Sequence, residues 1–224
     1  MTDLNPILLS FELAGITTFI LLIISVPLAY WLSITKSKTK PIIDTFVSMP
    51  LVLPPSVLGF YLLVAFSPAN FLGAFLQNIF NIRLVFSFEG LVIASLIYSL
   101  PFMVQPLQSG LESLPKSLNE AAETLGKGKV SILFNVLLPN IKPSLLTGIV
   151  LSFAHTIGEF GVVLMIGGNI PGKTRVASIA IYDEVESLNY HSANVYALIL
   201  FLITFIILLT VYYTNHKYFR VGKT

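Results

Sequence analysis

The sequence has no cysteine and few charged side chains. The absence of cysteine from its 224 residues excludes disulfides, thiolate metal sites and cysteine nucleophiles. Charged residues make up 11% of the chain and hydrophobic residues 55%, whereas a typical soluble domain has about 25% charged residues. A water-soluble globular domain is therefore excluded. We expect one all-α domain over residues 1–224, a polytopic helix bundle in a lipid bilayer.

Basic clusters and catalytic groupings are also lacking. The 13 basic and 11 acidic residues leave a net charge of +2, which is too balanced for a nucleic-acid-binding protein. The histidines His155, His191 and His216 are too scattered for metal-ligand spacing, and no serine–histidine–aspartate grouping has support. We therefore expect no nucleic-acid partner, no metal site and no enzyme active site in this chain.

Five apolar stretches are long enough to cross a membrane. About 20 helical residues span the ~30 Å hydrocarbon core of a bilayer, and the stretches are Leu13–Ile34, Thr45–Phe66, Gly90–Leu111, Pro143–Ile170 and Ser192–Asn215. The first exceeds the apolar core of a signal peptide and has no cation before it, so we expect a retained helix. The segment Phe71–Phe80 is short for a crossing, and we interpret it as an outer, re-entrant or packing helix. A count of six spans stays open.

Positive charges gather on one side of these spans. Five alternating spans place ten of the 13 Lys and Arg residues on that side, namely Lys36, Lys38, Lys40, Lys116, Lys127, Lys129, Lys142, Lys217, Arg220 and Lys223. The other side keeps Arg83, Lys173 and Arg175. Because cytoplasmic loops are enriched in Lys and Arg, we predict an N-terminus outside the cell and a C-terminus in the cytoplasm.

Prolines interrupt several predicted spans. Pro50, Pro54 and Pro55 lie close together in the second span, beside Ser56 and Gly59. Each proline removes a backbone hydrogen bond that lipid cannot replace, so such a helix must pack against neighbours or line water. We interpret Pro54, Pro55 and Ser56 as part of a bent helix facing a gate or pathway, and plain helix packing is the alternative. Because the five predicted helices of one chain are too few to enclose a sealed pore easily, we expect a homodimer.

Glu159 is an ionisable residue inside the fourth predicted span. Such residues are functional candidates by default, and His155 lies one turn earlier at the i, i+4 spacing of helix pairs. We interpret the two side chains as a pair that satisfies itself or braces a gate between helices, with a proton relay as the alternative. No Lys or Arg lies within a predicted span. Only weak donors therefore remain for an anion, and these are Ser56, Ser95, Ser99, Ser152, Thr156 and backbone amides.

Residues 167–174 match the pattern of a phosphate-binding loop. Gly167 is followed after four residues by Gly172, Lys173 and Thr174. That motif needs a strand before it and free backbone amides, and Pro171 has no amide. We therefore interpret the segment as an outer loop that contacts a docking protein or attracts an anion.

The connection between the third and fourth predicted spans is long. Ser117 and Glu120 have the spacing of a capping box at a helix start. An apolar stripe at helical spacing follows and ends at Gly126; its members are Leu118, Ala121, Ala122 and Leu125. A second stripe ends before Pro139, and its members are Val130, Leu133, Phe134 and Leu137. We predict two short amphipathic helices within residues 113–139, the coupling loop. The apolar stripes of these helices either lie on the membrane surface or pack under the bundle, or else they fit a complementary pocket on a cytoplasmic partner.

This loop resembles the EAA motif of the membrane subunits of binding-protein-dependent ABC importers. The residues that carry the resemblance are Glu120, Ala121, Ala122, Leu125, Gly126, Leu138 and Pro139, with Gly148 further on. The resemblance implies the type I importer permease fold and gives these residues a role in coupling to cytoplasmic ATP-binding subunits. It also implies that ATP and magnesium act in that partner, and that this chain holds no cofactor.

Further segments are similar to molybdate permeases. These are Pro50–Gly59, Gly158–Gly161, Asn169–Thr174 and Ala180–Tyr182. The resemblance implies a bacterial or archaeal inner-membrane protein that translocates an oxyanion, above all molybdate, delivered by an extracellular binding protein. Sulfate and tungstate permeases are alternatives. So, in a different class, is an ATP-independent secondary anion carrier.

Overall fold

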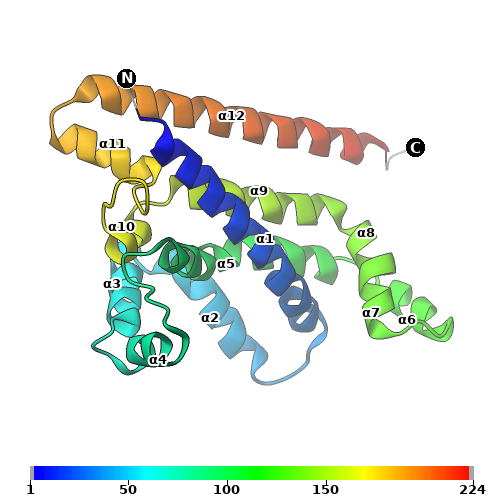
Figure 1. Cartoon of the computed structure of the whole chain (residues 1–224). Coiled ribbons are helices and arrows are strands. Elements are labelled where there is room, and N and C mark those ends of the chain that lie inside the picture. Colours follow the sequence, from blue (N-terminus) through cyan, green and yellow to red (C-terminus); the bar gives the residue numbers. More distant parts are fainter. Residues whose placement is uncertain (1–2, 222–224) are drawn as a thin grey trace.

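The computed structural model describes residues 3–221, with the side chains of residues 3–213. Every regular element in this part of the chain is a helix (Figure 1), as the all-α prediction requires. The elements are α1 (Asn5–Ile34), α2 (Lys40–Val52), α3 (Pro55–Phe66), α4 (Phe71–Phe80), α5 (Phe88–Glu112), α6 (Lys116–Thr124), α7 (Lys129–Ile132), the π-helical turn η1 (Leu133–Leu137), α8 (Leu138–Asn140), α9 (Lys142–Gly158), α10 (Gly161–Gly167), α11 (Ala177–Glu186) and α12 (Tyr190–Val221). Of the predicted cytoplasmic cations, the side chains of Lys217 and Arg220 and the whole of Lys223 lie outside the described set.

Helices α1, α5 and α9 form the centre of the bundle. α5 and α9 approach each other closely at two glycines. A Cβ atom added to Gly148 would lie 3.2 Å from the carbonyl oxygen of Met103, and one added to Gly110 would lie 2.6 Å from the hydroxyl of Ser144. Small residues allow this close contact, which holds membrane helices together without a hydrophobic driving force between them.

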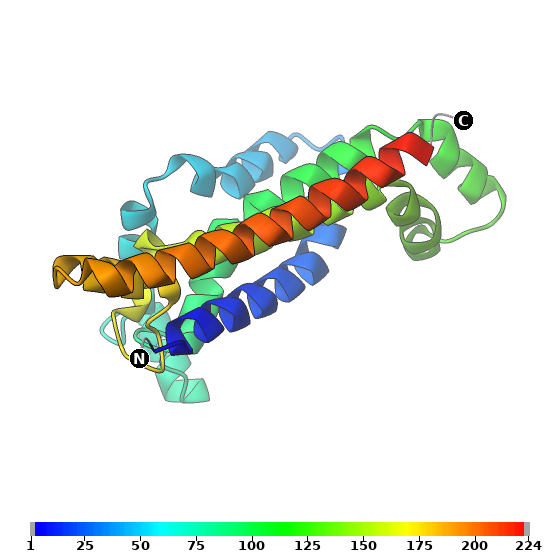
Figure 2. The same cartoon turned by 90° about the horizontal axis from the view of Figure 1, so that it is seen from above.

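The interior is divided between the two ends of the bundle. At one end, residues of α1 and α5 pack with the coupling loop, and Leu32, Leu107 and Leu133 belong to this cluster. At the other end, residues of α1 and α5 pack with α3 and α10, and Leu91 and Ile166 belong to this second cluster. Figures 1 and 2 show α6–α8 at the first end and α3, α4, α10 and α11 at the second.

The second predicted span is broken into two helices. α2 ends at Val52, α3 begins at Pro55, and their axes differ by 112°. Because neither Pro54 nor Pro55 has an amide, the helix cannot continue through them. Pro55 instead takes the first position of α3, where its missing amide costs nothing. The bend expected from the prolines is thus a complete break.

The fourth predicted span, Pro143–Ile170, is wrong beyond Gly158. α9 ends at Gly158, and the short helix α10 starts only at Gly161. The backbone of Glu159 is extended, with φ −67° and ψ 134°, and its carbonyl oxygen accepts a hydrogen bond from the Ser178 hydroxyl of α11. A further bend of 84° separates α9 from the helical residues of α7–α8.

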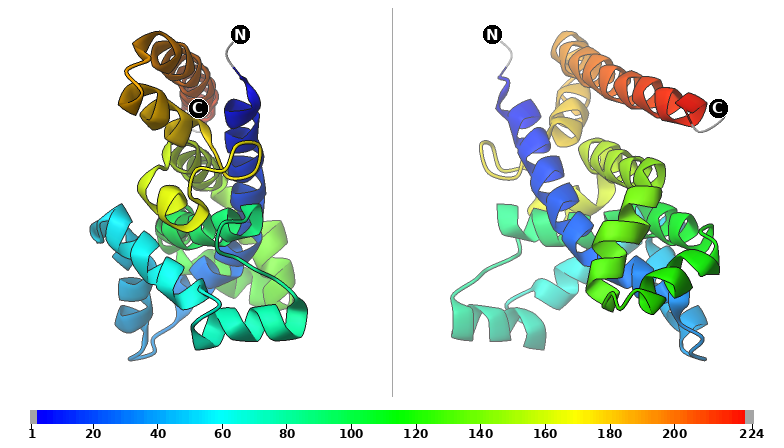
Figure 3. Two further views of the ribbon diagram at one scale, coloured as in Figure 1. Left: turned by 60° about the vertical axis from the view of Figure 1, so that its left-hand side comes forward. Right: turned by 90° about the vertical axis from the view of Figure 1, so that its right-hand side faces the viewer.

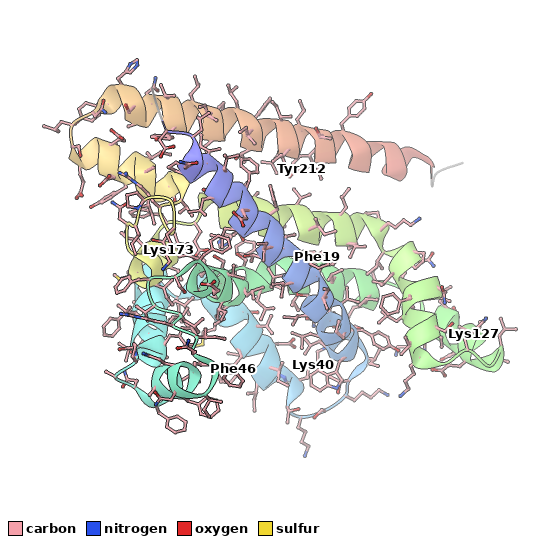
Figure 4. The ribbon with its side chains drawn as sticks, viewed as in Figure 1. Phe19, Lys40, Phe46, Lys127, Lys173 and Tyr212 are labelled. Atoms are coloured by element: carbon pink, nitrogen blue, oxygen red, sulfur yellow. The ribbon has the colours of Figure 1, made fainter. Side chains whose placement is uncertain are left out.

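By length and composition, three described helices can cross a membrane, and five spans result if each bent pair crosses as one. The three are α1, α5 and α12. Figure 3 shows α12 at the periphery of the bundle; it packs on α11 and α9. Phe19, Phe46 and Tyr212 are exposed and point outward from three different helices (Figure 4), as expected for surfaces that face lipid. α4 is a ten-residue helix that packs against α3, too short to cross.

The first and last helices run between the two ends of the bundle. α1 begins near α11, and α12 extends from α11 toward the end that holds α6–α8 (Figure 1). Lys127 lies in the coupling loop and Lys173 at the opposite end (Figure 4). Which end faces the cytoplasm stays a prediction from the distribution of Lys and Arg.

Candidate functional site

Helix α6 begins without the predicted capping box. It starts at Lys116, Pro115 is the N-cap residue, and no side chain caps the first turn. Ser117 and Glu120 therefore both lie inside the helix, and the capping-box prediction is wrong. The physical reason is Pro115: its fixed φ favours a helix start directly after it, two residues earlier than the sequence pattern suggested.

Gly126 ends α6 in the left-handed conformation that was predicted, with φ 73°. Its amide donates to the carbonyl oxygen of Glu123 at 2.9 Å, and the amide of Lys127 donates to that of Ala122 at 3.1 Å. This pair of hydrogen bonds is the Schellman motif. A Cβ atom on Gly126 would meet nothing within 4 Å. Glycine is thus required by the backbone conformation and not by lack of space.

The apolar stripe of α6 is divided between the interior and the surface. Ala122 is buried in the same cluster as Leu133, whereas Glu120 and Ala121 are exposed. Leu125 is 77% exposed. α6 is therefore anchored to its own bundle through Ala122, and it presents Leu125 outward.

The second stripe divides in the same way. Leu133 and Leu137 are buried, whereas Val130 is 72% and Phe134 57% exposed. α6 packs against α7 and η1, so exposed apolar side chains of both stripes belong to one end of the molecule. We refer to Leu125, Val130 and Phe134 as the loop surface. Outside the membrane-spanning helices, groups of exposed large apolar side chains mark protein–protein or membrane interaction sites.

The helix continues past the predicted stop at Pro139 and ends at Asn140. The preceding residues 133–137 form a π-helical turn, because Pro139 has no amide to donate within the α-helical ladder. Pro139 is exposed and Leu138 is half-buried. Such single π turns are frequent at functional sites.

The opposite end of the molecule contains a cavity of about 600 Å³. It lies where the break between α2 and α3 meets the break between α9 and α10. Four of the five predicted gate or pathway residues line it, namely Pro55, Ser56, His155 and Glu159. Pro54, the fifth, caps the start of α3 outside the cavity lining.

The two breaks are held together at glycines. A Cβ atom on Gly161 would lie 2.7 Å from Cβ of Pro55, and one on Gly59 would lie 2.8 Å from Cβ of Met165. Helices α3 and α10 therefore pack with their backbones in close approach. No sequence motif indicates this pairing, since it joins residues about 100 positions apart.

Glu159 is 4% exposed and connects three helices. Its carboxyl Oε2 accepts a hydrogen bond from the Ser95 hydroxyl of α5 at 3.0 Å, and its main-chain carbonyl accepts from Ser178 of α11 at 2.5 Å. Carboxyl Oε1 is buried and has no hydrogen-bond partner among the described residues. An unsatisfied buried polar atom of this kind is unusual and costs about 1–3 kcal/mol.

His155 forms a second polar connection between α9 and α5. Its Nδ1 lies 3.0 Å from the Ser99 hydroxyl, which lies 3.0 Å from the Thr156 hydroxyl. Because Thr156 donates its single proton to the Ser152 carbonyl, Ser99 must donate to Thr156 and His155 Nδ1 must donate to Ser99. The imidazole also stacks on Phe102, with ring centroids 4.0 Å apart.

These contacts correct the interpretation of His155 and Glu159 as a pair that satisfies itself. Each side chain instead hydrogen-bonds to a serine of α5. The sequence pattern identifies Ser95 and Ser99 only as weak donors for an anion; with Phe102 they stand at i, i+4 and i+7 of one helix face. Nothing in the sequence pattern indicated that this face meets α9 rather than another helix.

The segment of residues 167–174 is not a phosphate-binding loop. The residues before it form helix α10 and not a strand. The hydroxyl of Thr174 is buried, donates to the Gly167 carbonyl at 2.7 Å and accepts from the Ile170 amide at 3.1 Å. Thr174 thus closes the loop on itself. Arg175 forms an ion pair with Asp183 of α11. Within the described residues, no three His, Cys, Asp or Glu side chains gather as a metal site.

Comparison with known sequences gives a consistent set of relatives. Residues 22–218 match the family described as "Binding-protein-dependent transport system inner membrane component". The chain is 46% identical to the molybdenum transport system permease protein ModB of Azotobacter vinelandii, over 98% of this chain and 96% of that protein. It is 34% identical to ModB of Escherichia coli K12, over 82% and 80%. It is 33% identical to the sulfate transport system permease protein CysT of Salmonella typhimurium, over 82% and 66%.

Solved structures show the same fold. A bacterial ABC transporter for import of the acidic polysaccharide alginate matches with a TM-score of 0.78 at 15% identity, over 96% of this chain and 79% of that chain. The MetNI methionine ABC transporter in an inward-facing conformation matches with a TM-score of 0.74 at 16% identity, over 96% and 95%. At these identities the likeness establishes the fold alone.

Proposed function

The chain belongs to the family of binding-protein-dependent transport system inner membrane components, and from this premise we propose that it is the permease subunit of a molybdate importer. It is a multi-pass inner-membrane permease. The observation that carries the proposal is the 46% identity to a molybdenum permease over nearly the full length of both chains. Sulfate is the second candidate, because a sulfate permease is 33% identical to this chain, and tungstate remains a chemical alternative.

We propose that the coupling loop, residues 113–139, docks on a separate ATP-binding subunit that holds ATP and magnesium. The loop surface supports this role, because a docked partner would cover its three exposed apolar side chains. Glu120, Ala121, Ala122, Leu125, Gly126, Leu138 and Pro139 are the residues proposed for coupling. Lys127 and Lys129 beside Gly128 favour an acidic patch on the partner.

We further propose that the permease works as a homodimer and receives its oxyanion from an extracellular binding protein. Among the described side chains of α12, residues 190–213, the buried ones are Ala193 and Tyr196, which leaves ample apolar surface for lipid and a second copy. In this arrangement the loop end faces the cytoplasm and the cavity end faces outward. ATP binding moves the coupling loops, the broken helices rearrange, and access to the pathway alternates between the two sides.

Reconstitution tests the proposal directly. The chain is co-expressed with its cognate ATP-binding subunit and binding protein and incorporated into liposomes with ATP inside. Uptake of molybdate that requires both ATP and the binding protein is the expected result, with tungstate and sulfate as competitors. Preferred uptake of sulfate would replace the proposed substrate. Uptake of an anion without ATP would instead identify a secondary carrier and contradict the importer.

A further inference from the structure

The start of α3 presents unused hydrogen-bond donors to the cavity. Ser56 lines the cavity, and neither its amide nor its hydroxyl has a hydrogen-bond partner among the described residues. The following amides of Val57 and Leu58 are both satisfied by the Pro54 carbonyl. Ser56 therefore carries the one free amide in the first turn of α3, where an N-capping acceptor normally binds.

The end of α9 carries an unused acceptor beside the same cavity. Glu159 also lines it, and carboxyl Oε1 is buried without a partner, while Oε2 is held by Ser95 of α5. The site thus contains two donors and one acceptor that are complementary in chemistry. The backbones around them already touch: a Cβ atom on Gly161 would lie 3.5 Å from the Ser56 nitrogen.

We propose that Glu159 is a positioning residue that closes this cavity by capping α3: in the closed state carboxyl Oε1 accepts hydrogen bonds from Ser56, while Oε2 keeps its bond to Ser95. One carboxyl group then joins α5, the α9–α10 break and the α2–α3 break. In the structure described here, which we assign to the open state, carboxyl Oε1 and the Ser56 donors have no hydrogen-bond partner among the described residues. The inference rests on the proposed transport cycle, which supplies the reason for the cavity to open and close.

The attachments of α2 and α3 allow this movement. α2 is fixed to α5 by the ion pair of Lys40 with Glu112 at 3.0 Å and by a hydrogen bond from Gln105 to Ser48 at 3.1 Å. α3 packs mainly on α10 instead. Because α2 and α3 are attached to different helices, α3 can tilt on α10, which itself packs on α5, while α2 stays on α5. Closing the cavity gives the buried carboxyl Oε1 of Glu159 the hydrogen bond that it lacks, and this gain favours the closed state.

The absence of cysteine from the chain provides a direct measurement. Gly158 lines the cavity, and a Cβ atom there would meet nothing within 4 Å. Gly158→Cys therefore introduces the chain's one thiol without disturbing its neighbours. Its rate of labelling by a small maleimide, read as a mass shift of this chain in the complex with its ATP-binding subunit, reports how open the cavity is. Labelling is compared in the absence of nucleotide and with ATP trapped by vanadate.

We expect labelling to be at least about tenfold slower in one of the two nucleotide states, the population change expected from one hydrogen bond to a carboxyl group. Glu159→Leu in the same background should label rapidly in both states. Glu159→Gln keeps an acceptor oxygen and should retain most of the protection, and Ser56→Ala, which keeps the amide, should lose part of it. Ser33→Ala is the control, because that hydroxyl bonds only within its own helix.

Protection that persists in Glu159→Leu would overturn the proposal, as would equal labelling of the parent Gly158→Cys protein in both states. A purely structural role predicts that Glu159→Leu lowers the unfolding temperature of the complex and that Glu159→Gln does not restore nucleotide-dependent labelling. The measurement needs ATP but no transported anion. A permease that proves to carry sulfate would therefore still show closure, and failure of the substrate assignment is distinguishable from failure of this inference.

Discussion

The coupling loop exposes apolar side chains, which proteins usually bury, whereas the cavity end buries a polar atom without the partner that such atoms usually have. The coupling loop exposes the apolar side chains of Leu125, Val130 and Phe134, although it is not part of the long helices that can cross a membrane. The cavity end buries Glu159 with one carboxyl oxygen unpaired. Both arrangements raise the free energy of the isolated chain. Under the proposals made above, a partner molecule covers the apolar side chains of the loop end, whereas a second conformation of the same chain pairs the polar groups of the cavity end.

The largest effect is expected from a change in the backbone conformation of the coupling loop. Gly126→Val places a β-branched residue at φ 73°, where it is strained by about 1–3 kcal/mol. We expect ATP-driven uptake to fall on the order of 10- to 100-fold, while membrane insertion and ATP hydrolysis by the partner persist. Liposome uptake and ATPase assays on the same preparation measure this uncoupling.

Gly128→Val is the matched control for that experiment. Gly128 has an ordinary negative φ of −73° and, like Gly126, open space around its Cβ position. Normal uptake is expected for this variant. If both valine variants transport normally, the left-handed end of α6 has no part in coupling.

The next largest effect is expected from a charge on the loop surface. Phe134→Asp should weaken association with the ATP-binding subunit about tenfold or more, because exposed aromatic side chains are frequent hot spots of interfaces. Titration of the purified subunits in detergent measures the dissociation constant. Asn135→Asp adds the same charge at the neighbouring exposed position. Equal binding by the two variants would show that charge alone, and not the loss of the aromatic ring, governs association.

A smaller effect is expected where α10 meets α3. Gly161→Ala would place Cβ 2.7 Å from Cβ of Pro55, so the helices must separate, at a cost of about 1–3 kcal/mol. Thermal unfolding in detergent should show a lower midpoint than for the unmodified chain. Gly158→Ala, in the same cavity but with no atom within 4 Å, should leave the midpoint unchanged. A midpoint that is lowered equally in both variants contradicts the close packing of α3 on α10.

The smallest effect concerns the polar attachment of α2. Lys40→Gln removes the ion pair with Glu112, whose side chain is 42% exposed. Partly exposed ion pairs contribute less than about 1 kcal/mol, so stability in low salt should fall by no more than this. The difference should vanish in high salt because exposed charges are screened. A loss that persists in high salt would indicate packing by the lysine stem instead.

Features fixed by local chemistry were predictable from the sequence. Gly126 ends α6 because few other residues adopt its left-handed conformation, and Pro54 and Pro55 interrupt a helix wherever they occur. The prediction of a capping box at Ser117 was wrong because Pro115 favours a helix start two residues upstream. The sequence pattern alone does not show which of these two starts is preferred. The short length of α4 likewise followed from the chain itself.

Features that depend on tertiary packing were not predictable. Glu159 had a partner at the correct helical spacing in His155, yet both bond to serines of α5, and only the packing of α9 on α5 decides this. The pairing of α3 with α10 depends on two glycines far apart in sequence. Most predicted gate residues line the cavity because prolines and an intramembrane acid mark broken helices in general. Their mutual arrangement required the structure.

The two-residue joint between α2 and α3 has a mechanical consequence. α2 has 13 residues and α3 has 12, so at 1.5 Å per residue the arms on either side of Leu53 and Pro54 are about 20 and 18 Å long. A swing of only about 10° about this elbow displaces the far end of α3 by about 3 Å, roughly the width of a water molecule. In the proposed transport cycle, a small torsional change at this joint is therefore enough to admit water to the cavity or to exclude it.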